Sequence, residues 1–158
     1  MKKFLWYGSA VVAVGAAIFI GYTAYNQPTL LKFDGKWVST PLKHELLDDN
    51  NYSVEVASGS NAIYSNEAGQ KLFINEDEEG YIKEIQVDTD MSETSNMSVY
   101  GDIQLGDTEE KVAEFYGNPR YDMGRGKLYV RRLSDTKNDN IYIGVMDGKV
   151  IHIEIVYE

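Results

Sequence analysis

The chain has 158 residues, with fifteen Lys and Arg against twenty-five Asp and Glu, and its formal net charge is −10 at pH 7. This acidic balance excludes nucleic acid and an anionic lipid surface as electrostatic partners, because both require basic patches. The sequence contains no cysteine, which excludes disulfides, lipid attachment through a lipobox cysteine and a cysteine nucleophile.

An apolar segment follows two lysines at the start of the chain. Residues 4–25 contain no charged side chain after Lys2 and Lys3, and a helix of about 20 such residues crosses a bilayer. The pattern predicts a signal-anchor transmembrane helix over residues 1–25, with a cytoplasmic N-terminus and an extracytoplasmic remainder in a single-pass cell-membrane protein. The alternative is secretion after signal cleavage, although a cut after Ala24 would place the bulky Tyr22 at the third position before it.

Residues 26–96 are predicted to form a first α+β unit with a linker. A small strand pair is expected around the turn Asp34–Gly35, within residues 30–38. Thr40 and Pro41 are residue types that begin helices, and we expect a helix from Pro41 to Leu47. Alternating segments then predict strands at residues 52–56, 71–74 and 81–87, with the acidic run 76–80 as a hairpin turn.

Residues 97–158 are predicted to form a second α+β unit. Asp107 or Thr108 is expected to cap a helix that ends at Gly117, before Pro119. Strands are expected at residues 127–133, 140–146 and 149–157, the last two joined through the turn signal Asp147–Gly148. The fold class is therefore α+β, an N-terminal transmembrane helix followed by a tandem repeat of one helix packed on a three-stranded antiparallel sheet.

A short pattern in the second half resembles a known superfamily. It reads Ile103-x-Leu105-Gly106-Asp107-Thr108-x-x-x-Val112-x-x-x-Tyr116-Gly117-x-Pro119, and a Gly148-Lys149-Val150 hairpin follows. This is similar to the β-lactamase-inhibitor-protein-like (BLIP-like) superfamily, which includes the SmpA/OmlA outer-membrane assembly lipoproteins and the CAP-associated domains of Gram-positive exported proteins. The resemblance covers residues 103–157, and it implies a helix-plus-sheet fold with non-enzymatic binding or scaffolding.

The strands of the second half predict a candidate binding face. Strand side chains alternate between two faces, so the aliphatic set, with Leu128 and Val130, is expected to lie under the helix. The opposite face would carry residue types that are common at interfaces. Alternatively, this face is an ordinary solvated surface, or it packs against the first half. The predicted binding residues are Tyr129, Arg131, Tyr142, Met146, His152 and Glu154.

A second candidate is the loop after Pro119, where cations gather in an otherwise acidic chain. These residues could receive an acidic partner, or they could balance neighbouring carboxylates. The predicted loop set is Arg120, Tyr121, Arg125 and Lys127.

Catalytic and metal-binding patterns are weak. The chain has two histidines, His44 and His152, and no G-x-S-x-G sequence. The acidic runs 48–51 and 76–79 lack the spacing of a calcium-binding EF-hand loop. We therefore expect no enzyme activity, no cofactor and no metal.

The sequence predicts a class of function. We expect a membrane-anchored, extracytoplasmic protein-binding module, an inhibitor-like or scaffolding protein at the bacterial cell envelope, whose partner is an envelope or secreted protein. The alternative is a sensor of a small-molecule or cell-wall ligand that uses the cleft between the two units.

Overall fold

The structure is a computed structural model that describes residues 31–38, 40–133 and 139–158. Strands dominate these ranges, which contain two α-helices, α2 (Glu45–Asp49) and α3 (Glu109–Tyr116). The strands are β1 (Leu31–Phe33), β2 (Lys36–Trp37), β3 (Ser53–Ser58), β4 (Asn61–Ser65), β5 (Lys71–Glu76), β6 (Ile82–Asp88), β7 (Met97–Val99), β8 (Tyr121–Asp122), β9 (Gly126–Arg132), β10 (Asn140–Met146) and β11 (Lys149–Val156).

Eight of these strands form one antiparallel sheet in the order β3-β4-β5-β6-β11-β10-β9-β8. Strands β3 to β6 run from one edge of the sheet to its centre, and strands β8 to β11 run from the other edge to the centre. The central pair is therefore β6–β11. Ile155 lies opposite Ile85, and Ile153 lies opposite Val87, in that pair. All four side chains are fully buried. The core of the molecule therefore runs through the middle of this sheet.

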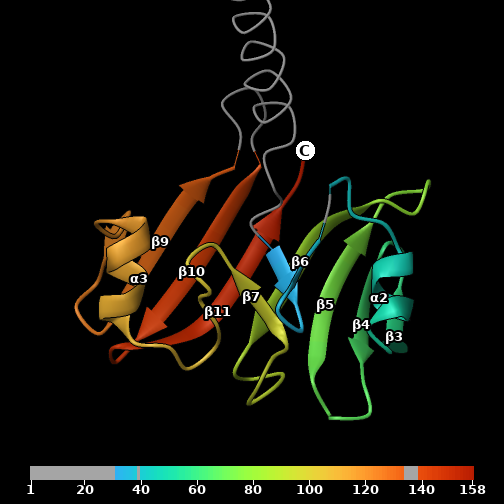
Figure 1. Ribbon diagram of the computed structural model, residues 1–158, viewed down its shortest axis with the longest axis horizontal. Coiled ribbons are helices and arrows are strands. Elements are labelled where there is room, and N and C mark those ends of the chain that lie inside the picture. Colours follow the sequence, from blue (N-terminus) through green and yellow to red (C-terminus); the bar gives the residue numbers. More distant parts are fainter. Residues whose placement is uncertain (1–30, 39, 134–138) are drawn as a thin grey trace, which may run out of the picture.

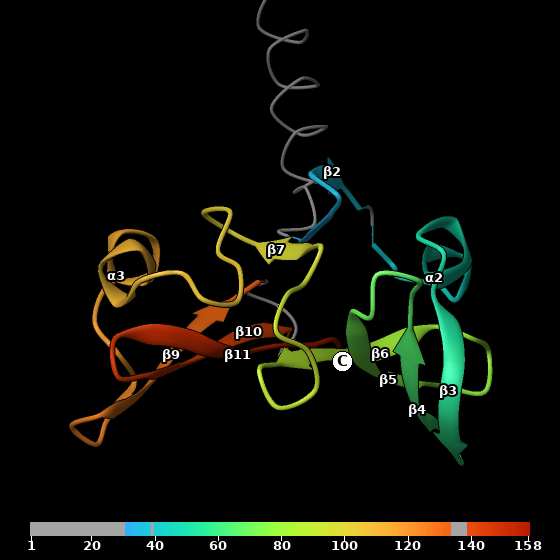
Figure 2. The ribbon, with the colours of Figure 1, turned by 90° about the horizontal axis from the view of Figure 1, so that it is seen from below.

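A small sheet, β2-β1-β7, and both helices cover one side of the large sheet (Figures 1 and 2). Leu31 and Phe33 of β1 and Met97 and Val99 of β7 are buried, and β1 pairs with β7 across the two halves of the sequence. We call this side of the large sheet the covered face. The opposite side, which no described element covers in Figure 2, is called the open face.

Several local predictions are confirmed. The Thr108 hydroxyl accepts a hydrogen bond from the Lys111 backbone N–H at 3.4 Å and caps α3, and Gly117 ends the helix at a φ of 74°. The turn at Asp147–Gly148 joins β10 to β11, and both of its residues have a positive φ, 50° and 76°. Such a turn matches the twist of the strands it connects.

The predicted tandem repeat of one helix on a three-stranded antiparallel sheet is wrong. The structure has sheets of eight and three strands, not two separate helix-covered units. β6 and β11 both bury aliphatic side chains on the covered face, and separate sheets would leave the inner edges of these strands without backbone partners. Pairing the two strands satisfies their N–H and C=O groups and makes one buried layer.

Three elements differ from the prediction for local reasons. The Leu42 carbonyl accepts a hydrogen bond from the Ile82 N–H at 3.0 Å, so the chain after Pro41 is held beside β6 and α2 begins later, at Glu45. β4 and β7 lie where the sequence pattern predicts no strand, because each is short and contains Ser or Asn.

No helix within the described ranges has the length and apolar character needed to span a membrane. The predicted signal-anchor helix, residues 1–25, lies outside the described residues, so it stays a prediction.

Candidate functional site

The open face of the large sheet collects most of the predicted binding residues. Tyr142 of β10 lies between Val130 of β9 and Glu154 of β11. The next residue pair on this face adds His152, opposite Gly144. Tyr142, Met146, His152 and Glu154 therefore lie on one surface, as the alternation of the strands predicts.

Tyr129 and Arg131 lie on the other side of the sheet, under α3. The Tyr129 hydroxyl donates a hydrogen bond to Glu109 of α3 at 3.0 Å, and this side chain is 1% exposed. Arg131 donates to the Phe115 carbonyl at 3.3 Å, and its guanidinium lies 3.7 Å from the centre of the Tyr100 ring. The sequence-based assignment of these two residues to the candidate face is wrong.

Their displacement has a physical cause. Tyr129 and Arg131 of β9 form hydrogen bonds with α3. These bonds place the polar side chains of the strand on the covered face and its aliphatic side chains on the open face. Leu128 and Val130, which we expected under the helix, are consequently on the open face. In β10 the opposite holds, because Ile141 and Ile143 are buried on the covered face.

An apolar patch occupies the open face over β8, β9 and β10. Tyr121 lies opposite Leu128 and is 59% exposed, and Met146 is 42% exposed. The Met146 side chain reaches over Gly126, where an added Cβ would meet its Cε at 3.5 Å. We call this surface the first apolar patch, and its members are Tyr121, Leu128, Val130, Tyr142 and Met146.

Three carboxylates and a histidine cross the middle of the open face, on β6 and β11. His152 Nε2 lies 3.5 Å from Glu154 Oε2, and His152 Nδ1 lies 4.0 Å from Asp88 Oδ2. Burial and the negative charge of Glu154 raise the pKa of Glu84, and His152 opposes this effect. We call Glu84, Asp88, His152 and Glu154 the acidic stripe.

A second apolar patch lies beyond the acidic stripe. Val56, Ile63 and Phe73 stand side by side on β3, β4 and β5, and Phe73 lies opposite Gln86 of β6. Val56 is 57% exposed. This patch could not be predicted from the sequence, because Phe73 is flanked by the equally apolar Leu72 and Ile74 and the pattern does not show which of them faces outward.

The predicted basic loop does not form one surface. Arg125 binds Asp147 through two hydrogen bonds of 2.6 and 2.5 Å, and Lys127 lies 2.5 Å from Glu109 on the covered face. The hydrogen bonds from Lys127 and Tyr129 lower the pKa of Glu109. Burial, together with Glu109, raises the pKa of Tyr129 to about 12. Tyr121 joins the first apolar patch, and Arg120 is exposed.

The acidic run 76–79 is built as a turn. The Asp77 carboxylate accepts hydrogen bonds from the Tyr81 and Glu79 N–H groups at 2.9 and 3.0 Å, so it closes the β5–β6 connection. No group of three or more His, Asp or Glu side chains within the described ranges is arranged to hold a metal ion.

Comparison with known proteins adds no relative. No family model, no curated protein and no solved structure matches the chain. The resemblance to the BLIP-like superfamily therefore stays a prediction.

Proposed function

We propose that this chain is a membrane-anchored, extracytoplasmic binding module of the bacterial cell envelope, and that its partner is a protein that docks on the open face. The observation that carries the proposal is the first apolar patch, which no described element covers. Together with the acidic stripe and the second apolar patch, it makes a surface that extends from β8 to β3.

The composition of this face supports protein recognition over simple solvation. Tyrosine and methionine are enriched at interfaces, and residues with the largest energetic effect gather near the centre in desolvated positions. Leu128, Val130 and Tyr142 form a half-buried, outward-facing row on that side of the sheet. Contiguous exposed apolar area of this kind marks interaction sites.

The acidic stripe indicates the charge of the partner. Glu84, Asp88 and Glu154 carry negative charge between two apolar patches, and the whole chain is acidic. A partner with basic side chains between apolar contacts would complement this order. Electrostatic complementarity of this kind increases the association rate and the specificity.

The alternative of a ligand sensor has less support. It needs a cleft between two units, whereas β6 and β11 pair directly and join both halves in one sheet. In the described part, a cavity of about 600 Å³ lies within the first half and one of about 280 Å³ lies between residues of both halves; neither is lined by His152.

Site-specific photocrosslinking in the producing cells tests the proposal. A benzophenone amino acid placed at Tyr142 reports contacts of the open face, and the matched control carries it at Glu114, an exposed position on α3. We expect Tyr142 to capture one envelope or secreted protein that Glu114 does not capture.

A double substitution then links that protein to the patch. With Tyr142→Ala and Met146→Ala combined, we expect recovery of the captured protein to fall roughly thirtyfold, since loss of a central contact costs about 2 kcal/mol. A thermal unfolding curve verifies that the variant is folded. Equal capture from both probe positions, or unchanged recovery with the folded variant, would contradict the proposal.

A further inference from the structure

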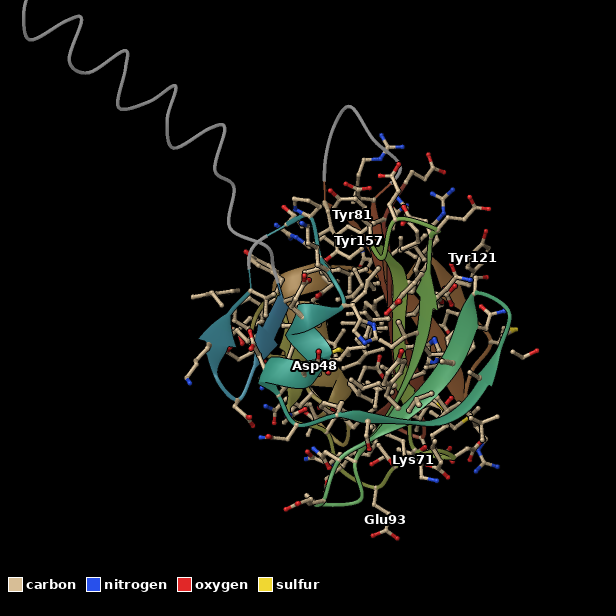
Figure 3. The ribbon with its side chains drawn as sticks, turned by 90° about the vertical axis from the view of Figure 1, so that its right-hand side faces the viewer. Asp48, Lys71, Tyr81, Glu93, Tyr121 and Tyr157 are labelled. Atoms are coloured by element: carbon tan, nitrogen blue, oxygen red, sulfur yellow. The ribbon has the colours of Figure 1, made fainter. Side chains whose placement is uncertain are left out.

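A groove lies at the end of the sheet away from the first apolar patch. It has a volume of about 600 Å³, and Ala57, Ala62 and Ile74 form apolar parts of its lining. These side chains alternate with Ile63 and Phe73 of the open face, so the groove is on the covered face. Figure 3 looks at this end of the molecule, where Asp48 marks α2.

Tyr64 places a polar group at the groove without a partner. The side chain lines the groove and is 8% exposed, and its ring packs edge-on against His44, with 5.7 Å between the centroids. Its hydroxyl makes no hydrogen bond with any described residue. The hydroxyl is therefore available to an occupant of the groove as a hydrogen-bond donor or acceptor.

The rim of the groove is acidic. Glu76, Asp77 and Glu78 line it. Glu76 binds His44 at 2.8 Å, and Asp77 is occupied by the turn and by Lys83 at 3.1 Å. Glu78 is exposed and has no ion pair with the described residues, so it is free to bind a cation. The charge of the rim favours an occupant with an ammonium or guanidinium group.

The groove adjoins a free sheet edge. β3 is the outermost strand of the large sheet, and each of its six residues is exposed. Ala57 of this strand lines the groove. An edge strand presents unpaired N–H and C=O groups that can accept a further strand. An occupant that uses both features is an extended peptide and not a small free amine.

We propose that an extended, basic peptide segment of a partner protein adds to the outer edge of β3 and inserts a lysine or arginine side chain into the groove. The aliphatic stem of that side chain fits the apolar lining, and its charged head fits Glu78 and the rim. This site is separate from the open face and does not depend on the function proposed for that face.

Peptide binding to the full-length chain in detergent micelles tests the site. The probe is a fluorescein-labelled pentapeptide of alternating valine and lysine, and fluorescence anisotropy measures its affinity. We expect the same peptide with norleucine in place of lysine, and the same peptide N-methylated on alternate backbone nitrogens, each to bind at least tenfold more weakly. Equal affinity of either control peptide would overturn the proposal.

Two neighbouring glutamates give a matched pair of variants. Glu78 lines the groove, whereas Glu79 is an exposed residue of the same turn that does not line it. We expect Glu78→Lys to weaken the lysine peptide about tenfold and Glu79→Lys to weaken it less than twofold. Tyr64→Phe should weaken it about threefold, because only the hydroxyl is removed. Equal effects at the two glutamates would show that net charge alone attracts the peptide.

Hydrogen–deuterium exchange locates the bound peptide. We expect slower exchange in residues 53–58 when the lysine peptide is present, and no change in β8, the strand at the opposite edge. Protection at β8 instead of β3 would overturn the assignment. Full displacement of the peptide by spermidine without any protection of β3 would identify a site for free amines and would also overturn it.

Discussion

Glu84 lies where the open face is most acidic. Its pKa is raised by burial and then by the charge of Glu154, with His152 acting in the opposite direction. A carboxyl group whose pKa is higher in the folded chain than in the unfolded chain stabilises the fold only while it is protonated. Ionisation of Glu84 at neutral pH therefore lowers the free energy of unfolding.

Replacement of Glu84 by Gln should stabilise the protein at neutral pH. We expect the free energy of unfolding at pH 7 to rise by about 0.5 kcal/mol, because an unfavourable cross-strand charge contact is removed. The gain should vanish as the pH falls below about 4, where Glu84 is protonated in both states. Urea unfolding of both proteins from pH 7 to pH 3.5 measures this. A constant difference at every pH would contradict the argument.

At the level of single side chains, the alternation of β10 and β11 could be predicted from the sequence, whereas that of β9 could not. Ile141 and Ile143 alternate with Tyr142 in a pattern whose apolar members are clearly the buried ones. In β9 one set of alternating side chains is aliphatic and the other is amphipathic. Which set faces α3 depends on contacts with Glu109 and Tyr100, which are distant in sequence. The burial of Tyr129 and Arg131 follows from those contacts and has no local signal.

Among the elements, α3 packs closely against the loop that follows β7. The loop after β7 approaches it so closely that a Cβ added to Gly101 would lie 2.5 Å from Cγ of Phe115. Tyr100 packs edge-on against Phe115 at 5.8 Å between ring centroids. Gly101 also has a φ of +82°, which disfavours any residue with a side chain. The glycine is therefore required for both backbone geometry and space.

Two glycine substitutions separate these requirements. Gly124 has a φ of +79° but has no neighbouring atom within 4 Å of an added Cβ. We expect Gly124→Ala to cost about 1 kcal/mol from backbone strain alone. Gly101→Ala should cost about 2 kcal/mol more, because the side chain overpacks the contact with α3. Thermal and urea unfolding measure both; equal costs would show that the loop moves away from α3 freely.

Short sequence patterns correctly predicted where a helix begins and ends and where a hairpin turns. The Thr108 cap, the Gly117 end and the Asp147–Gly148 turn each act within four residues, and each is confirmed. α2 and β4 did not follow from sequence in the same way. The start of α2 is set by a backbone bond to β6, and β4 exists because β3 and β5 lie on either side of it.

On the scale of the whole molecule, the β6–β11 pair makes the two halves of the chain one cooperative structure. Backbone pairing joins residues 84–88 to residues 152–156, and β1–β7 pairing adds a second connection between the halves. No local sequence pattern predicts the pairing of β6 with β11, because the strand pattern of each half is also typical of a separate sheet. The choice depends on how free strand edges are satisfied, which is a property of the complete chain.

A destabilising substitution in the β6–β11 pair should lower the stability of both halves of the chain together. Ile155 is fully buried between β6 and β10, and we expect Ile155→Ala to lower the free energy of unfolding by about 3 kcal/mol. The matched change Ile63→Ala, on the open face, should cost about 1 kcal/mol. Hydrogen exchange should show equal loss of protection in β5 and β10 for Ile155→Ala. Loss in only one of these strands would mean that the halves unfold separately.

The inward strand order also has a consequence for biosynthesis. β6 is complete by Asp88, whereas its inner neighbour β11 begins only at Lys149. During synthesis, the inner edge of β6 therefore stays unpaired for the time needed to make some sixty further residues. Pairings between distant segments form slowly and expose nascent chains to misassembly. We expect this protein to depend on a holding chaperone until its last strand emerges.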